Sequence, residues 1–221
     1  MSKEKEQFIY LSYFLDSETP LYGGYKGIKI TPGNQISLGD NANTKNLSLH
    51  NHSGTHVDFP NHFFEDGNVS DNYDASFWVF NNPYVLNLVV YPGMIIKPSQ
   101  EQIEQVPPNT DFLILKTGFG KFRGEEVYWN NNPGLDPDLA NSLRIQCTSL
   151  RAIGMDFISI TSFQNRPLGR IAHKAFLGKS PILLVEDMNL SQLNGRPFTV
   201  FCFPLLVKGI DGSPVTVIAK L

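Results

Sequence analysis

The sequence contains little of what several common classes of protein require. It has only two cysteines, Cys147 and Cys202, among 221 residues, so a disulfide framework is excluded and a reducing cytosol is the simplest compartment. Its 18 basic residues do not outnumber its 21 acidic ones, so the positive charge that binds nucleic-acid phosphates is missing. No apolar run approaches the roughly 20 residues of a membrane-spanning helix. We therefore expect a cytoplasmic protein that binds neither nucleic acid nor a membrane.

The length fits a single domain over residues 1–221, because no linker-like stretch divides the chain. Apolar runs rich in Val, Ile and Phe predict strands, most of them buried on both faces. These runs lie at 8–15, 84–91, 111–116, 152–160, 181–185, 199–207 and 214–219, and a short alternating segment lies at 47–52. Polar, turn-rich stretches at 68–74 and 123–134 predict surface loops that shape a pocket.

Helices are fewer than strands. Ser99 opens a capping box for a short helix that reaches Gln105, and Pro137 suits the first position of a second helix. A third helix is predicted at 168–177, where Gly178 ends it. Because strands do not alternate regularly with helices, we expect a mixed α/β domain rather than a plain doubly wound sheet.

Histidine is scarce, yet it is concentrated in one short segment. Four of the five histidines lie within residues 50–62, and such crowding is most often due to metal binding. His52, His56, Asp58 and His62 all have even numbers, and alternate residues of an extended chain share one face. The odd positions are mostly apolar, so we predict a ligand face opposite a core face. We interpret His50 as an ordinary histidine outside this set.

A straight strand cannot bring these side chains together. From His52 to His62 it would span about 33 Å, whereas a zinc–nitrogen bond is only about 2.0–2.1 Å long. Gly54 permits unusual backbone angles, and Pro60 restricts itself and the residue before it, so we predict bends at both. A zinc-binding helix is disfavoured, because no glutamate follows the first histidine and both Gly54 and Pro60 oppose a helix.

Two further ligand types lie downstream. His173 falls within the third predicted helix, and Glu186 closes the apolar run at 181–185. A carboxylate at such a place is costly to bury unless it is paired or bound to a metal. Taken alone, Glu186 would more often point to water.

The segment HSGTHVDFPNH, from His52 to His62, resembles the signature of the cyclase family, which includes bacterial kynurenine formamidase (arylformamidase) and isatin hydrolase. Every fixed position of the pattern His-x-Gly-Thr-His-x-Asp-x-Pro-x-His is met. Weaker similarities cover nearly the whole chain and lie at 19–24, 113–118, 154–159, 173–178, 185–188 and 211–215. The resemblance implies an α/β fold, a mixed-sheet swivelling β/β/α domain, that assembles as a homodimer or homotetramer.

The resemblance also implies a metal centre with two ions. His52, His56 and Asp58 would hold the first ion, and Asp58 would bridge to a second ion completed by His173 and Glu186. Nitrogen and oxygen ligands of this kind suit Zn²⁺, of which the resemblance implies two per subunit, and Mn²⁺ is the other candidate.

Two more roles follow from the same resemblance. His62 would be the catalytic proton donor and acceptor, and Tyr22 would lie beside the substrate. The chain departs from the family at Tyr22, Gly23 and Thr161, where Trp, Pro and Asp are common. These departures leave the metal ligands unchanged.

The residues and the resemblance together predict a metal-dependent hydrolase that cleaves a C–N bond of an amide, formamide or lactam with metal-activated hydroxide. An alternative is a non-haem Fe(II) oxygenase whose facial triad is His56, Asp58 and His173. That alternative leaves two motif histidines unused and lacks an arginine soon after His173. A third possibility is a non-catalytic metal-binding protein.

Overall fold

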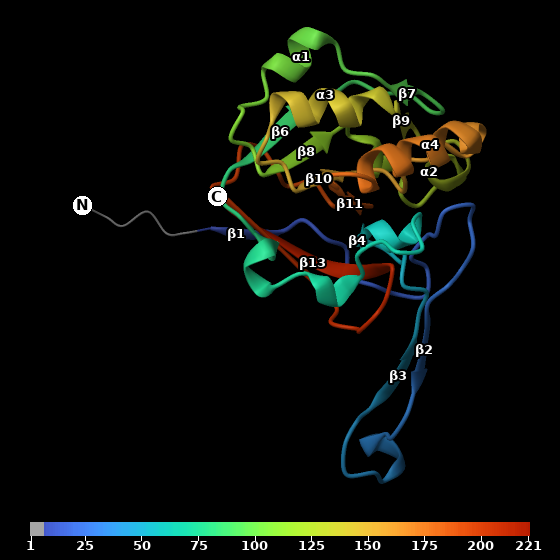
Figure 1. Ribbon diagram of the computed structural model, residues 1–221. Helices are drawn as coiled ribbons and strands as arrows, with labels where there is room; N and C mark the ends of the chain where they lie inside the picture. The colour runs from blue at the N-terminus through green and yellow to red at the C-terminus, as the bar shows by residue number, and fades with distance from the viewer. Residues whose placement is uncertain (1–6) are drawn as a thin grey trace.

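The computed structural model describes residues 7–221 and has a mixed α/β fold, as expected (Figure 1). Its strands are β1 (Phe8–Tyr10), β2 (Lys29–Pro32), β3 (Lys45–Ser48), β4 (His56–Asp58), β5 (Val79–Phe80), β6 (Pro83–Asn87), β7 (Ile95–Ile96), β8 (Phe112–Lys116), β9 (Gly134–Leu135), β10 (Ala152–Met155), β11 (Leu183–Glu186), β12 (Thr199–Pro204) and β13 (Gly212–Lys220). The α-helices are α1 (Gln100–Glu104), α2 (Glu126–Asn130), α3 (Asp138–Gln146) and α4 (Arg166–Leu177). Short 3₁₀ helices are η1 (Ile36–Leu38), η2 (Pro60–His62), η3 (Ser70–Asn72), η4 (Ala75–Trp78), η5 (Phe119–Phe122) and η6 (Phe163–Asn165).

One large mixed sheet forms the centre of the fold. Its strands follow the order β5-β12-β13-β4-β11-β10-β8-β6, and β1 pairs with the C-terminal part of β13. The strands β6, β8, β10 and β11 are parallel, whereas β4 runs antiparallel to both β11 and β13. The short strand β4 therefore joins the parallel half of the sheet to the antiparallel half.

The parallel strands are apolar along their length because both of their faces are covered. In β8 the residues from Phe112 to Leu115 are fully buried, and β10 and β11 are buried throughout. Figure 1 shows α3 and α4 lying side by side over these strands. The turns around residue 75 lie on the other side of β13.

The helix signals are confirmed to within two residues. Ser99 accepts a hydrogen bond from the backbone of Gln102 and caps α1, Pro137 directly precedes α3, and α4 ends before Gly178. Most strands are shorter than their apolar runs, whereas β13 extends beyond its run at 214–219 in both directions. The run at 8–15 leaves the sheet after Tyr10, although β13 continues to Gly212, because Thr55 and β4 take the same edge of β13 from Val215 onwards.

A hairpin of β2 and β3 projects from the body of the molecule (Figure 1). None of its strand residues is buried, and the large apolar side chains Ile30, Ile36, Leu38 and Leu47 are exposed along it. Within residues 7–221, no helix has the length and apolar character needed to cross a bilayer.

Candidate active site

The two predicted bends bring the motif histidines together. Gly54 has a φ of 62°, a left-handed conformation that favours glycine, and Pro60 opens the 3₁₀ turn η2. Only His56–Asp58 between them is a strand. As a result, the ring of His52 lies 5.2 Å from that of His56 and 4.2 Å from that of His62, between ring centroids.

The strand order then brings distant carboxylates to the same point. On one side of β4, Glu186 of β11 pairs with His56. On its other side, Gly212 of β13 pairs with Asp58, which places Asp211 beside the motif. The helix α4 packs against β11 and carries His173 to the cluster. The structure thus brings together all five residues that the resemblance identifies as metal ligands.

The distances from His56 and His173 to the carboxylates are longer than ordinary hydrogen bonds, whereas Nδ1 of His52 lies 2.8 Å from Asp58. Nε2 of His56 lies 3.4 Å from both Asp58 and Glu186, and Nε2 of His173 lies 3.5 Å from Asp58 and 3.7 Å from Glu186. Normal N–H···O bonds are about 2.7–3.2 Å. In a tetrahedral zinc site with bonds of about 2.0–2.1 Å, two ligand atoms bound to the same ion lie about 3.3 Å apart. The spacing therefore suits a cation between these nitrogens and oxygens.

The far sides of both imidazoles are occupied by backbone carbonyls. Nδ1 of His56 lies 2.8 Å from the oxygen of Gly54, and Nδ1 of His173 lies 2.9 Å from the oxygen of Gly169. A carbonyl can only accept, so each Nδ1 carries the hydrogen. The neutral ring then directs the lone pair of Nε2 towards the carboxylates, and this is how metal-binding histidines are oriented in proteins.

Both carboxylates are deeply buried, and the surrounding histidines keep Asp58 ionised. Asp58 is 1 % exposed and Glu186 is 3 % exposed. Burial raises the pKa of Asp58, but hydrogen bonds from His173, His52 and His56 outweigh it and hold that pKa well below its usual range. Burial lowers the pKa of His56, yet the two carboxylates raise it well above its ordinary value. In the absence of a metal ion, the histidines of the cluster therefore carry the positive charge as bound protons.

Glu186 is oriented by neighbouring groups as well as by the histidines. Its Oε1 accepts a hydrogen bond from the backbone N–H of Ile160 at 2.7 Å and one from the hydroxyl of Ser159 at 3.2 Å. Its Oε2 faces His56. The prediction that an isolated Glu186 would point to water does not hold here, because β11 lies between β10 and β4 in the sheet.

His62 lies at the open side of the cluster and is paired with Asp211. Nδ1 of His62 is 2.7 Å from the Asp211 carboxylate, which also lies 3.1 Å from Nε2 of His52. The other nitrogen of His52 is 2.8 Å from Asp58. Burial raises the pKa of Asp211, but His62 and His52 lower it to about 2, so this residue is a carboxylate at neutral pH.

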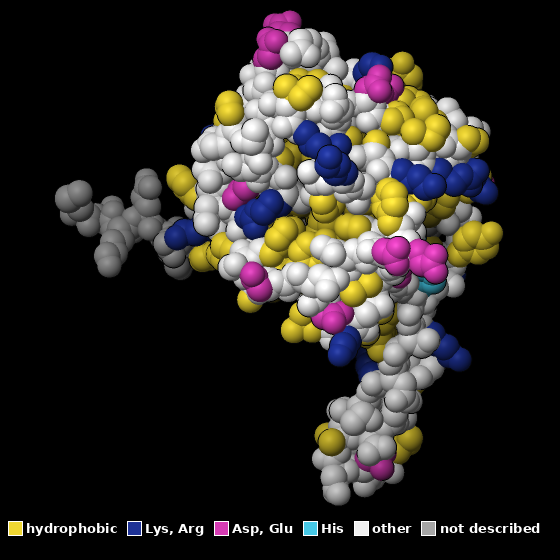
Figure 2. All heavy atoms as spheres, viewed as in Figure 1, with side chains coloured by type: hydrophobic (Ala, Val, Ile, Leu, Met, Phe, Trp, Pro, Cys, Tyr) yellow, Lys and Arg dark blue, Asp and Glu magenta, His cyan; other side chains and the backbone are white. Residues whose placement is uncertain are grey.

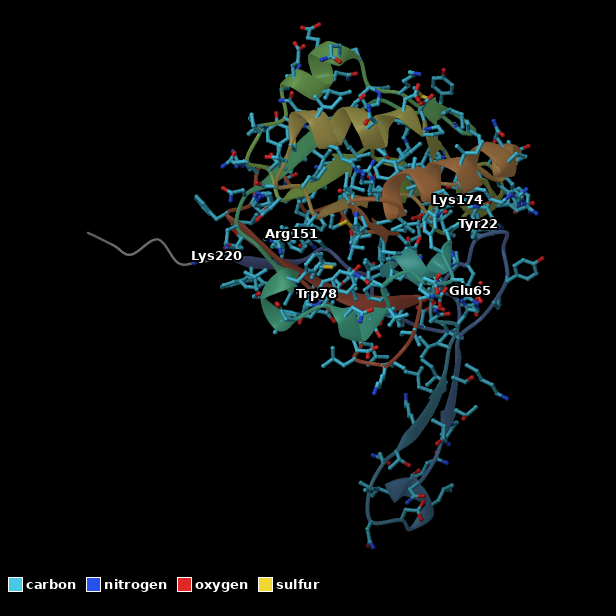
Figure 3. The ribbon with its side chains drawn as sticks, in the orientation of Figure 1. Tyr22, Glu65, Trp78, Arg151, Lys174 and Lys220 are labelled. Carbon is cyan, nitrogen blue, oxygen red and sulfur yellow. The ribbon has the colours of Figure 1, made fainter. Side chains whose placement is uncertain are left out.

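The cluster forms one wall of a pocket of about 420 Å³, which is the size of a small-molecule site. Apolar side chains line much of the remaining wall: Leu21, Tyr22, Phe63 and Ile158. Tyr22 thus lies at the pocket, where the resemblance places it. Figure 3 shows it between α4 and the segment that carries Glu65.

The loops predicted to shape this pocket do not line it. Neither 68–74 nor 123–134 contributes a lining residue, so that prediction is wrong. The second stretch acts indirectly, because the backbone oxygen of Trp129 accepts a hydrogen bond from Gly23, next to Tyr22. His50 is exposed and lies at the pocket edge, outside the ligand cluster.

Sequence reasoning missed three charged residues at the pocket. Asp211 lies within the weak family similarity at 211–215, which carries no role for it, and the sequence predictions include neither Arg166 nor Arg170, although both arginines line the pocket. The sequence did contain a signal for the arginines. Residues three or four apart share a helix face, and Arg170 lies three residues before His173 and four after Arg166. No local signal marked Asp211.

Comparisons with known proteins identify relatives of this chain along most of its length. The chain is 26 % identical to cyclase-like protein 3 of Arabidopsis thaliana over 95 % of its own length and 78 % of the relative's. It is 25 % identical to the kynurenine formamidase of Geobacillus thermodenitrificans (strain NG80-2) over 94 % of both chains.

Solved structures show the same fold. Isatin hydrolase A from Labrenzia aggregata, bound to benzyl benzoate, superposes with a TM-score of 0.81 at 21 % identity and covers 98 % of this chain and 94 % of that one. A structure described as a potential metal-dependent hydrolase with cyclase activity gives 0.76 at 19 % identity over 98 % of both chains. The expected mixed-sheet fold is thereby confirmed. The family model described as putative cyclase matches residues 9–162, well over half of the chain, and the protein belongs to the cyclase family.

Proposed function

We propose that this protein is a metal-dependent hydrolase that cleaves a C–N bond of a small amide, formamide or lactam. The names of its relatives support hydrolysis, since they include a kynurenine formamidase and isatin hydrolases. The observation that carries the proposal is the pair of Nε2 atoms, on His56 and His173, that face buried carboxylates at 3.4–3.7 Å while their Nδ1 atoms are held by carbonyls.

The ligand groups suit two divalent ions that share Asp58. Ligand atoms of His52, His56 and Asp58 converge within 4.8 Å, and so do those of Asp58, His173 and Glu186. Zn²⁺ is our first choice and Mn²⁺ our second, because both accept imidazole and carboxylate ligands. Ions bound there would supply an activated water and polarise the carbonyl of the substrate.

The side chains of the protein supply the remaining steps. The Asp211 carboxylate accepts the Nδ1 hydrogen of His62, which leaves Nε2 of that ring free to exchange a proton. We propose that Nε2 of His62 takes a proton from the attacking water and gives it to the departing nitrogen, because an amine leaves far more readily once it is protonated. Tyr22 and Phe63 would position the substrate against this histidine and limit the access of water.

The alternatives receive less support from the geometry. An Fe(II) oxygenase needs only His56, Asp58 and His173 and leaves positions open for oxygen. Here Glu186 and His52 crowd the same three residues. A non-catalytic metal-binding protein would have no use for the pairing of His62 with Asp211.

One experiment separates the three. Metal analysis of the purified protein is combined with a screen of formamides, lactams and cyclic imides in the presence of Zn²⁺ or Mn²⁺, with and without oxygen. We expect hydrolysis that needs the metal and not oxygen. Turnover that depends on iron and oxygen would replace the proposal with an oxygenase, and metal binding without any turnover would leave a binding protein.

We further propose that the protein acts in the cytosol as a homodimer or homotetramer built from one domain. Cys147 and Cys202 are buried free thiols. The projecting β2–β3 hairpin supports assembly, because a two-stranded ribbon is only marginally stable by itself and here carries exposed apolar side chains. Light scattering coupled to size-exclusion chromatography would give the subunit number, and a monomer at micromolar concentration would contradict this part of the proposal.

A further inference from the structure

Two arginines of α4 line the active-site pocket together with the cluster. Arg166 and Arg170 are four residues apart, so they lie on the same face of the helix. Within residues 7–221 neither forms an ion pair with a carboxylate. Figure 2 shows basic side chains gathered along the edge of α4. The pocket thus has two positive charges that no protein group neutralises.

Arg166 is held in place by aromatic rings. Its guanidinium carbon lies 4.0 Å from the centroid of Phe163 and 6.0 Å from that of Tyr22. Stacking of this kind fixes the plane of the guanidinium and leaves its N–H groups free to donate at the edge. The Tyr22 hydroxyl beside it is buried and forms no hydrogen bond of normal geometry in the described part of the chain. Burial raises the pKa of this hydroxyl, and the neighbouring Arg166 guanidinium acts against that rise. The Tyr22 oxygen can accept from one N–H of Arg166, and the remaining N–H groups can donate to a ligand in the pocket.

The acidic residues nearby do not fill this role. Asp58 and Glu186 also line the pocket, but histidines already contact them. Glu65 and Asp66 are exposed and do not belong to the lining. Among the described residues, no carboxylate is therefore paired with either arginine, and a ligand can supply one.

We propose that Arg166 and Arg170 bind a carboxylate of the substrate, so that the enzyme acts on a small amide, formamide or lactam that carries a carboxylate on an apolar body. This inference deepens the proposed function and rests on it. A guanidinium matches a carboxylate through two parallel hydrogen bonds. The apolar body would pack against Leu21, Phe63 and Ile158, between the arginines and the cluster.

The first test compares matched substrates. The three formamidobenzoates carry a carboxylate, and the corresponding formamidobenzamides replace it with a neutral amide of similar shape. Formate release by the metal-loaded enzyme reports cleavage of the same bond in both. We expect kcat/KM to favour at least one formamidobenzoate by roughly tenfold or more, as hydrogen bonds to a charged group would give. Equal rates for every matched pair would overturn the inference.

Variants then assign the preference to the arginines. Arg166→Gln, Arg170→Gln and the double variant should each lower the ratio of kcat/KM between charged and neutral substrates, mainly through KM. Lys174→Gln is the matched control, because it removes the same charge from the next turn of α4 outside the pocket lining. The inference fails if Lys174→Gln lowers the ratio as much as the arginine variants do.

Binding without turnover separates this inference from the proposed function. Calorimetry of the metal-loaded protein with benzoate, and with benzamide as its neutral counterpart, needs no hydrolysis. We expect benzoate to bind more weakly to the double variant than to the Lys174→Gln control. If no amide is cleaved but this difference appears, the hydrolase proposal fails and the carboxylate site stands. If hydrolysis occurs but benzoate affinity is the same in both variants, the carboxylate site is wrong.

Discussion

The carboxylate of Asp211 lies 2.7 Å from Nδ1 of His62, although 149 positions separate the two residues in the sequence. The same carboxylate lies 3.1 Å from Nε2 of His52 and accepts a hydrogen bond from the Asn51 amide at 2.7 Å. It therefore connects the histidine proposed to transfer protons with one proposed to hold a metal ion.

Asp211→Asn should lower turnover by about 10–100-fold, the usual effect of removing a group that orients a catalytic or metal-binding histidine. The amide can still fill the space, but it cannot hold the same charge against His62 and His52. Steady-state kinetics and metal content should be measured together. Asp66→Asn is the control, because Asp66 is exposed and lies outside the pocket lining. An unchanged kcat in Asp211→Asn would show that its contact with His62 has no role in turnover.

His62→Ala should reduce kcat by about 10²–10⁴-fold, the range of general acid–base catalysis. The ring lies at the open side of the cluster, so the five proposed ligands stay in place and the metal content should change little. Near-normal turnover with full metal content would remove His62 from the mechanism. His50→Ala, at the exposed pocket edge, should leave kcat within about twofold if only His62 exchanges the proton.

Metal stoichiometry should depend on which ligand is removed. Asp58 belongs to both ligand groups and His173 to only one. We expect Asp58→Asn to lose both ions and His173→Asn to keep about one of the two. Inductively coupled plasma mass spectrometry on dialysed protein measures this, with His50→Asn as the matched histidine control. Full occupancy in Asp58→Asn would contradict a shared carboxylate.

Gly212→Ala should weaken metal binding without changing any ligand. A Cβ added at Gly212 would lie 2.3 Å from the ring of His52, so that ring would have to move. We expect the metal affinity to fall by about 10–100-fold, as for other losses of ligand orientation. Gly195→Ala is the control, since nothing lies within 4 Å of its added Cβ. Equal metal affinities in the two variants would show that the position of the His52 ring beside Gly212 does not affect metal binding.

The metal-free protein should lose thermal stability as the pH rises above 6.5. Burial lowers the pKa of His56, but Asp58 and Glu186 raise it well above the ordinary 6.5; the pKa of His173 is also raised, since Asp58 and Glu186 outweigh its burial. A raised pKa gives stability that is complete below 6.5 and is lost as the pH passes the folded-state value. Bound metal replaces these protons, so it should remove the decline. Melting temperatures from pH 6 to 9.5, with EDTA and with Zn²⁺, check this, and parallel curves would contradict it.

Part of the site could be predicted from the sequence because it depends on local geometry. Gly54 and Pro60 have restricted or unusual backbone preferences, and they bend the motif where expected. Gly178 likewise marks the end of the predicted helix at 168–177, and His173 lies on α4, which ends before that glycine. The strand ends could not be predicted in this way, because β1 ends where Thr55 and β4 take over the edge of β13 and not where its apolar run ends.

The ligand types and the bends of the segment from His52 to His62 follow from the residues of that segment, since both depend on neighbours in the chain. The position of β4 between β11 and β13 is instead a property of the whole fold, and this pairing places Glu186 opposite His56 and brings Asp211 to His62. Strand order depends on the burial of apolar surface across the whole domain. A carboxylate far away in the chain therefore shows no local sign of the histidine that it will contact.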